Sequence, residues 1–358
     1  MRAILLNLLI TIIVLPFIGK AQDANFTQFY NNPIYYNPAN AGITDGLEIR
    51  TAYRKLWPGI GGGFRNMTLS ADVAEPAING GIGLIVHSGD EGGQVRESMA
   101  GLMYSYRLHL IRNKFYLQMG LQATAVEKRI HEDGLIFSDQ LDPLHGNVYP
   151  TSFQGANYDQ VVYPDFATGI AARFNIGEYA TGHARTTHIV GLAFAHITQP
   201  DESFVGLESR RPLKTVVHAQ SVIPLNAHYR RNDPKRALAP GIIYERQDMF
   251  QTVSTGLNIM LEPIYAGAWY RSNYLVAENV NINAFVLLIG LTKELSPELK
   301  MNLGYSYDIT TSKLSNATAG AHEITLSFSF NDYSFFRKYS PSLKRRNLGA
   351  KNCYWDFD

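Results

Sequence analysis

The chain has 358 residues and a formal net charge of +1, with basic side chains spread along its length. That size accommodates one large all-β domain or two smaller ones, and the balanced charge gives no support to nucleic-acid binding or to steering of acidic substrates. Aromatic residues make up 12% of the chain, with 21 Tyr and 18 Phe beside 30 Gly, a mixture that suits short strands and tight turns better than a helical enzyme.

The N-terminus has the pattern of a secretory signal peptide. Arg2 supplies a positive charge, the apolar stretch 4–18 follows it, and Gly-Lys-Ala at 19–21 approximates a small-residue cleavage site. A membrane anchor is the alternative, but the stretch is shorter than the roughly 20 residues that span a bilayer and no charged stop-transfer cluster follows it. We expect residues 1–21 to be removed, and the lack of a nearby cysteine excludes a lipoprotein anchor.

The lack of cysteine pairs and of long apolar runs limits which folds the rest of the chain can adopt. Cys353 is the only cysteine, so no intrachain disulfide and no multi-cysteine metal site can form. After residue 21 no run of roughly 18 apolar residues remains, so the sequence predicts no transmembrane helix. If the mature chain enters a membrane it must be a closed barrel, because only helices and barrels pair every backbone polar group in lipid.

Apolar and polar residues alternate over segments of about ten residues, which is the pattern of membrane-spanning strands. The clearest segments are 47–54, 117–125 and 299–308. Charged residues share the polar faces of two of these segments, and we expect them to line a wet lumen. They are Glu48, Arg50, Arg54, Lys300 and Asp308.

Further segments, in which the alternation of apolar and polar residues is less regular, raise the number of predicted strands to about 14. Together they predict a single antiparallel β-barrel over residues 46–330. An even number of strands places both barrel ends on one side of the membrane, which export makes the periplasmic side. The additional runs are 66–74, 79–87, 99–108, 165–175, 187–197, 214–225, 238–247, 250–260, 263–271, 281–292 and 320–330.

Connection lengths support this orientation. Residues 75–78 and 261–263 are short and contain proline, which is typical of tight periplasmic turns. The long connection from about 127 to 164 is rich in Asp, Gly, Pro, Asn and Tyr, and it is expected outside, either as a surface loop or as an inward-folded plug. A second outer connection, 199–211, carries five charged residues and is expected to be solvated.

Signatures of catalysis and metal binding are scarce. The glycine-rich segment 59–63 is not followed by the Lys and Ser or Thr of a phosphate loop. The histidine groups at 131–133 and 183–188 lack the spacing of a zinc motif, and Ser105 with His109 has no context for a nucleophile and base. We therefore predict a protein that is not an enzyme, with no cofactor, no metal, no nucleic-acid partner and no small-molecule substrate.

The segment from Asp23 to Gly42 is aromatic and does not have the pattern of a strand. Its Asn-Pro steps at 32–33 and 37–38 are expected to prevent helix and ladder pairing at those points. We assign residues 22–45 to a periplasmic N-terminal segment that is either a plug closing the periplasmic mouth or a docking surface. The candidate residues are Phe26, Phe29, Tyr30, Asn32, Pro33, Tyr35, Tyr36, Asn37 and Pro38.

The C-terminal region combines a final strand with a tail. Ile324, Leu326, Phe328 and Phe330 share one face of that strand, which resembles the terminal strand recognised by barrel-assembly machinery. Residues 331–358 should continue as a periplasmic tail, either a docking peptide or a frayed end, and docking is favoured by anchor-type side chains. These are Arg345, Arg346, Tyr354, Trp355 and Phe357.

Several segments resemble the PorP/SprF family of type IX secretion system membrane proteins. Residues 23–42 are similar to the N-terminal signature of that family, and 304–314 with 320–328 are similar to its closing hairpin. Segments 240–244 and 266–271 also look similar. The resemblance therefore spans essentially the whole mature chain.

The resemblance implies an outer-membrane barrel that works with the type IX translocon in gliding or adhesin-secreting bacteria. The implied partners are outer-membrane lipid and either a secreted adhesin or components of the secretion machinery. The expected function is to support secretion or surface attachment of the adhesin, or to anchor the machinery at the outer membrane. A passive porin or small-solute channel is the rival interpretation, because polar lumen faces suit it as well.

Overall fold

The structure is a computed structural model that describes residues 23–44, 46–111, 114–131, 135–142, 144–152, 159–176, 186–204, 208–225, 236–275, 280–311, 318–331 and 333. The signal peptide expected at 1–21 lies outside these residues, as do the tail residues 334–358. Among the described residues, no helix is long and apolar enough to cross a membrane.

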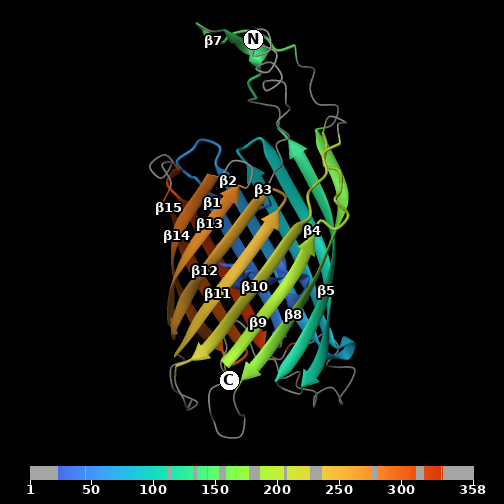
Figure 1. Cartoon of the computed structure of the whole chain (residues 1–358), viewed down its shortest axis with the longest axis vertical. Coiled ribbons are helices and arrows are strands. Elements are labelled where there is room, and N and C mark those ends of the chain that lie inside the picture. The colour runs from blue at the N-terminus through green and yellow to red at the C-terminus, as the bar shows by residue number, and fades with distance from the viewer. Residues whose placement is uncertain are drawn as a thin grey trace, which may run out of the picture.

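Fourteen antiparallel strands close into one barrel (Figure 1). They are β1 (Gly46–Leu56), β2 (Phe64–Glu75), β3 (Gly80–Glu91), β4 (Val95–Ile111), β5 (Phe115–Ile130), β8 (Gln160–Ile176), β9 (Thr186–Ala195), β10 (Lys214–Pro224), β11 (Arg236–Gln247), β12 (Phe250–Leu261), β13 (Ile264–Leu275), β14 (Val280–Ser296), β15 (Leu299–Thr310) and β16 (Ala321–Asn331). Each barrel strand pairs with the next along the chain, and β1 pairs with β16 to close the sheet. Every predicted run falls on one of these strands, so the predicted barrel is confirmed.

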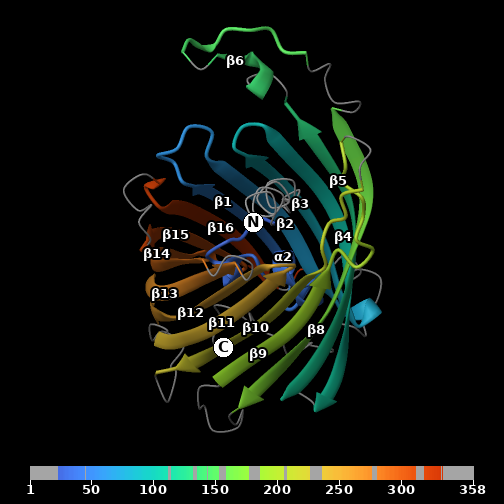
Figure 2. The ribbon, with the colours of Figure 1, turned by 45° about the horizontal axis from the view of Figure 1, so that its top comes forward.

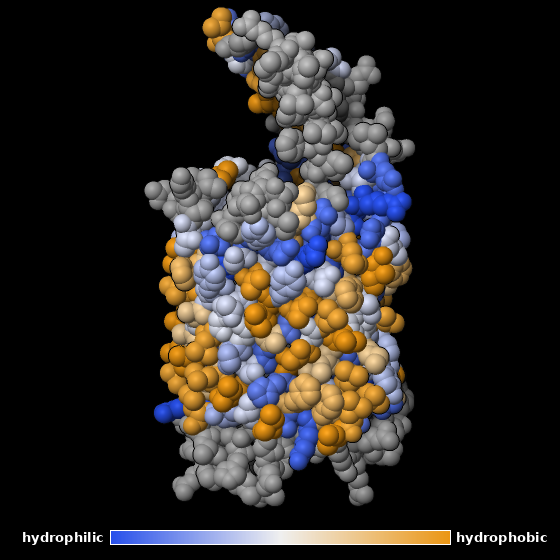
Figure 3. Space-filling view, in the orientation of Figure 1, coloured by the Kyte–Doolittle hydropathy of each residue, from blue (hydrophilic) through white to orange (hydrophobic). Residues whose placement is uncertain are grey.

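Side chains alternate between the outer surface and the interior, as the strand period of two requires. In β5, Met119 and Leu121 are 50% and 64% exposed, whereas Gln118 is buried. Apolar residues cover much of the outer wall in Figure 3. An apolar exterior around a charged interior is the arrangement that spans a bilayer. The charged residues predicted to line the lumen are all buried inside: Glu48, Arg50, Arg54, Lys300 and Asp308.

The two ends of the barrel differ in their connections. At the short-turn end, β2 joins β3 through η3 (Pro76–Ile78), and residues 262–263 join β12 to β13, so both predicted tight turns are confirmed. At the opposite, long-loop end, the connection between β5 and β8 contains η4 (Ser138–Gln140) and the paired strands β6 (Leu141–Asp142) and β7 (Gly146–Asn147). The described part of this connection stands beyond the barrel in Figures 1 and 2, so it is a surface loop.

Replacing Leu121 by Arg would place a charge on the outer face of β5. The expected cost is about 2–4 kcal/mol if the position lies near the bilayer midplane, because the guanidinium must leave water. Denaturant titration of the barrel folded into lipid vesicles would measure it. Leu144, which is 89% exposed on the connection beyond the barrel, provides the control. Leu144→Arg should change the stability by less than about 0.5 kcal/mol, and equal losses in both variants would contradict a lipid-facing β5.

Candidate functional site

Residues 23–44 run inside the barrel, from the long-loop end at Asp23 to the short-turn end at Gly42 and Thr44 (Figure 2). We call them the lumen segment. From Phe26 to Thr44 every residue except Tyr35 is buried. The segment thus occupies the space that an open channel would need, and the candidate site is the interface between this segment and the barrel wall.

Three short helical turns shape the lumen segment: η1 (Phe29–Asn31), α2 (Pro33–Tyr36) and η2 (Pro38–Asn40). The Asn-Pro steps were expected to prevent helix, and this is wrong. Proline is well suited to the first position of a helix, where its missing N–H is not needed. Each proline therefore opens a single turn, and the Asn37 side chain caps η2 by accepting the Ala39 amide at 2.9 Å.

Aromatic side chains of the lumen segment pack on the wall and on one another. Phe29 and Tyr30 contact Trp269 of β13 with ring centroids 5.5 and 5.9 Å apart. The Tyr36 hydroxyl accepts the amide of Phe26 at 2.7 Å and donates to its carbonyl at 2.8 Å. Such aromatic pairs each contribute about 0.5–1.5 kcal/mol beyond their buried area. The candidate aromatic residues of this segment therefore contact the lumen wall in this structure.

Glycines in the wall allow the lumen segment to approach closely. A Cβ added to Gly120 of β5 would collide with the backbone of Pro38 and Ala39, and one added to Gly169 of β8 would collide with Asn37. Sequence reasoning missed these positions. The available signal was a glycine inside a strand, which often marks a close approach of another backbone.

A buried ionic cluster holds the segment near Thr27. Asp308 of β15 lies between Arg54 and Arg271, at 2.7 and 2.8 Å from their guanidinium nitrogens. Glu323 of β16 accepts the Thr27 amide at 2.6 Å and the next amide at 2.8 Å. Thr27 also donates its hydroxyl to Asp308 at 2.9 Å. The segment therefore supplies hydrogen-bond donors to carboxylates of the wall.

At the short-turn end, the last turn of the segment is held through its backbone. The Gly42 amide donates to Asp72 at 2.8 Å. The Ala41 carbonyl accepts from the Ser105 hydroxyl at 2.6 Å and from the Gln118 side chain at 3.1 Å. Ser105, considered above as a possible nucleophile, is thus a structural hydrogen-bond donor in this arrangement.

At the long-loop end, Asp23 is surrounded by donors from three parts of the chain. His196 Nε2 and Arg211 Nη2 each lie 2.7 Å from its carboxylate. Gln247 of β11 donates to the same carboxylate at 3.0 Å and accepts the Asp23 amide at 3.0 Å. The other ring nitrogen of His196 lies 2.6 Å from Asp165 of β8.

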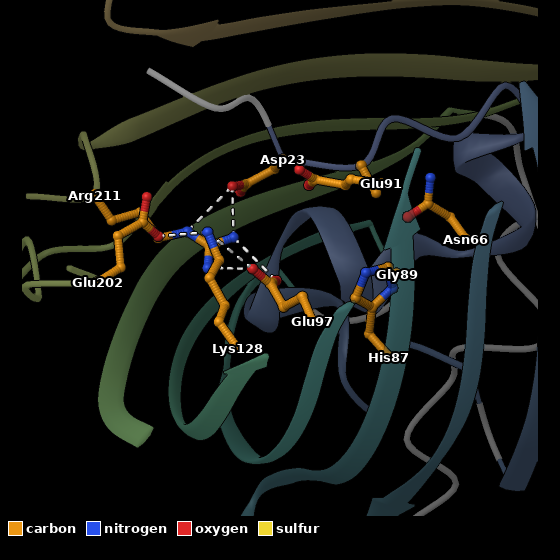
Figure 4. A pocket seen from close by; sticks show the side chains of 10 residues that line it. Asp23, Asn66, His87, Gly89, Glu91, Glu97, Lys128, Glu202 and Arg211 are labelled. Atoms are coloured by element: carbon orange, nitrogen blue, oxygen red, sulfur yellow. Dashed lines mark hydrogen bonds and ion pairs between the residues drawn. The ribbon is translucent and has the colours of Figure 1, made fainter. Parts of the chain in front are cut away.

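The ionic network continues from Asp23 into the wall (Figure 4). Arg211 also binds Glu97 of β4, at 2.8 and 3.1 Å. Lys128 of β5 lies 3.5 Å from Glu97 and 2.6 Å from Glu202. A pocket of about 10 Å³ remains among these groups, which is room for one water molecule.

The charges around Asp23 shift the pKa of its carboxyl and that of the neighbouring His196. Burial alone would raise the pKa of the Asp23 carboxyl, but Arg211, His196 and Lys214 hold that pKa well below its usual range. Burial alone would lower the pKa of His196, whereas the Asp23 charge and hydrogen bonds to Asp165 and Asp23 raise it above its usual value. The arrangement favours a carboxylate beside an imidazolium.

The expectation that connection 199–211 is solvated is wrong for two of its residues. Arg211 is buried and Glu202 binds Lys128, whereas Glu208 and Arg210 are exposed as expected. The described part of the connection folds back on itself through backbone bonds, such as the Arg211 amide to the Pro200 carbonyl at 2.9 Å. It turns into the barrel mouth because carboxylates there offer buried partners. We call the described residues 196–204 and 208–213 the inward hairpin.

An additional cavity of about 50 Å³ lies between the lumen segment and strands β4, β5, β8 and β9. Its lining includes Tyr35, Tyr36, Met99, Ala167 and Ala193. The volume is small beside the roughly 300–1,000 Å³ of typical ligand pockets. It matches a packing space better than a site for a small-molecule substrate.

Other residues singled out in the sequence do not come together as a catalytic or metal site. Ser105 is buried whereas His109 is exposed, and His188 lies 2.7 Å from Ser221. Among the described residues, no group of three His, Cys, Asp or Glu side chains is placed to hold a metal ion. His183 lies outside the described part of the chain.

The structure describes the candidate residues of the terminal strand but not those of the C-terminal tail. Ile324 is 48% exposed on the outer face of β16, and Leu326 and Phe328 share that face, whereas Thr325 and Ser327 are buried in the lumen. The division of the strand into two faces is as predicted. The tail candidates lie outside the described residues: Arg345, Arg346, Tyr354, Trp355 and Phe357.

Comparison with known proteins identifies one family. The family model described as "Type IX secretion system membrane protein PorP/SprF" matches residues 18–328, which include the lumen segment and nearly the whole barrel. No curated protein matches the chain.

Solved structures with some similarity are barrels of low identity. A FadL homologue of Pseudomonas aeruginosa is 12% identical over 85% of this chain and 94% of its own, with a TM-score of 0.42. The CymD monoaromatic hydrocarbon channel is 10% identical over 88% of this chain and 95% of its own, with a TM-score of 0.46. Both scores are below 0.5, and the fold described above rests on the strand pairing of this chain.

Replacing Gly120 by Ala should displace the lumen segment, because the new methyl group meets backbone atoms that cannot rotate away. Overpacking of this kind costs about 1–3 kcal/mol, and thermal unfolding of the purified barrel would measure it. Gly61 has open space at its Cβ position, so Gly61→Ala is the matched control and should leave the melting temperature unchanged. Equal melting temperatures for both variants would contradict the close contact.

Proposed function

The chain belongs to the PorP/SprF family of type IX secretion system membrane proteins and forms a β-barrel in the outer membrane, and from this we propose that it is a non-enzymatic accessory of that secretion system. In this role it supports secretion or cell-surface attachment of a partner adhesin, or it anchors secretion machinery at the outer membrane. Its partners are lipid along the outer wall and a secreted adhesin or secretion component at the barrel ends.

The occupied lumen is the observation that carries this proposal. Buried carboxylates of the wall bind backbone amides of the lumen segment, including Glu323 with Thr27 and Asp72 with Gly42. A solute could pass only if this segment moved, whereas a protein could dock on either end without disturbing it. The passive porin is therefore the less well supported alternative.

We propose that the short-turn end faces the periplasm and the long-loop end faces the cell exterior, because bacterial barrels have short periplasmic turns and longer outer loops. Both Gly46 and Asn331, the ends of the barrel, lie at the short-turn end. The proposed organisation is a signal peptide at 1–21, an N-terminal segment at 22–45, the barrel at 46–330 and a periplasmic tail at 331–358.

Partner contacts are proposed at both ends. The tail begins at the periplasmic end of β16, and its basic and aromatic residues are of the type that anchors protein interfaces. On the outer side, Leu144 and Tyr149 of the connection between β5 and β8 are 89% and 53% exposed, which offers apolar surface to a secreted partner. The exposed face of β16 serves barrel assembly in this proposal.

Deleting residues 334–358 should reduce recovery of the partner when the tagged barrel is purified from mildly solubilised outer membranes. A loss of roughly tenfold or more is expected, because aromatic and Arg anchors each contribute about 2 kcal/mol. Mass spectrometry of co-purifying proteins measures it, with Leu144→Arg as a variant that tests the outer contact separately. An intact barrel that repeatedly purifies alone would contradict the accessory role.

Purified barrels in planar bilayers should show little or no conductance, because the lumen segment fills the interior. Deleting residues 23–42 should produce stepwise conductance by opening that path. The full-length chain and the deletion are compared after confirming that both migrate as folded barrels. A large steady conductance from the full-length chain would favour the porin.

A further inference from the structure

Charged side chains form a row on the outer face of the barrel, near the long-loop end of strands β1 to β5. Lys55 of β1 stands directly opposite Arg65 of β2, and Arg65 stands opposite Asp90 of β3. Asp90 in turn stands opposite Arg96 of β4, and Arg96 stands opposite Arg129 of β5. We call these five residues the rim row.

The rim row lies where the outer face changes from charged to apolar. On β2, Arg65 is followed toward the short-turn end by Met67 and Leu69, which are each 50% exposed. On β1, the outward neighbour of Lys55 in the same direction is Tyr53, which is also exposed. Side chains two residues apart share one face of a strand, so the row continues the lipid-facing side. A charged position above an aromatic and an apolar one marks the boundary between membrane and water.

Two neighbouring pairs in the rim row have like charge. Lys55 faces Arg65, and Arg96 faces Arg129. Side chains directly opposite in an antiparallel sheet lie close together, and like charges in such positions destabilise the sheet. Arg129 has a carboxylate of its own strand nearby, since Glu127 lies 2.6 Å from its guanidinium. The other cations of these pairs would be stabilised by an anion placed against them.

The one carboxylate within the rim row does not balance its cations. Asp90 is bound by Arg65 and also accepts the Gly93 amide at 2.9 Å. Lys55 and Arg96 form no ion pair with any carboxylate in the described part of the chain. The row thus presents two unpaired positive charges on either side of a carboxylate that is already occupied.

We propose that the rim row binds the phosphate groups of lipid headgroups, with Lys55 and Arg96 as its unpaired contacts. A phosphate supplies the negative charge that the like-charged pairs lack, and its oxygens accept hydrogen bonds from ammonium and guanidinium groups. The apolar wall beside the row favours a phosphate attached to a lipid, because the acyl chains can lie along Met67 and Leu69 while the headgroup meets the cations.

The leaflet to which these lipids belong rests on the proposed function. With the long-loop end outside the cell, the rim row lies at the headgroups of the outer leaflet. Binding of the headgroup itself depends only on the row, and it can be measured without knowing the orientation or the secretion partner.

Native mass spectrometry of the full-length barrel in a neutral detergent tests the proposal. The probes are phosphatidylglycerol, which is anionic, and phosphatidylcholine, in which a choline cation offsets the phosphate. The unmodified barrel should retain phosphatidylglycerol selectively. Lys55→Gln/Arg96→Gln should weaken this binding about tenfold or more, since each cation near an anionic headgroup contributes most of one tenfold step.

The matched control removes the same charge from exposed positions that face no other cation. Arg246→Gln/Lys293→Gln meets this condition, because Arg246 stands opposite Thr215 and Gln251, and Lys293 stands opposite Met301. This control should leave phosphatidylglycerol binding unchanged. Lys55→Arg/Arg96→Lys keeps both charges in the row and should retain most of the binding.

Equal weakening by the rim variant and the control, or equal retention of the two lipids by the unmodified barrel, would overturn the proposal. Displacement of phosphatidylglycerol by inorganic phosphate at an equal concentration would assign the row to free phosphate and contradict a lipid site. Each of these outcomes leaves the type IX role untouched, because that role is tested by the proteins that co-purify with the barrel.

Discussion

Charges buried inside this barrel need partners, because an unpaired ion removed from water costs several kcal/mol. Asp308 is neutralised by Arg54 and Arg271, and the carboxylate of Glu323 completes its hydrogen bonds with two backbone amides of the lumen segment. Arginines of the wall thus pair with both carboxylates, since Arg54 also lies 3.1 Å from Glu323, and the lumen segment adds backbone donors to Glu323. These hydrogen bonds link the polar lumen to its occupant.

Close packing reinforces the ionic contacts. Trp269 contacts two aromatic rings of the lumen segment, while Gly120 and Gly169 leave room for its backbone on the opposite side of the lumen. Aromatic bulk on one wall and absent side chains on another therefore shape the space that the segment occupies. The result is a filled interior built from both the largest and the smallest residues.

Because the lumen is occupied, our proposal places the partner contacts at the two ends of the barrel. At the long-loop end, Arg211 of the inward hairpin binds Glu97 of the wall and Asp23 of the lumen segment. At the short-turn end, Gly42 and the last turn of the lumen segment are tied to Asp72 and the wall beside it. The two ends are therefore built differently, which suits a protein that meets different partners on the two sides of a membrane.

The sequence by itself determined the barrel, its strands and the lumen-facing charges of β1 and β15, because alternation with a period of two is a local property that each segment displays separately. It also identified residues 23–42 as a distinct aromatic segment. Only the tertiary structure decided where that segment lies, which glycines receive it and that Arg211 turns inward. Arg211 and Asp23 are 188 positions apart, and such a distant pairing leaves no mark on either local sequence, since an exposed and a buried arginine look the same until the partner carboxylates are placed.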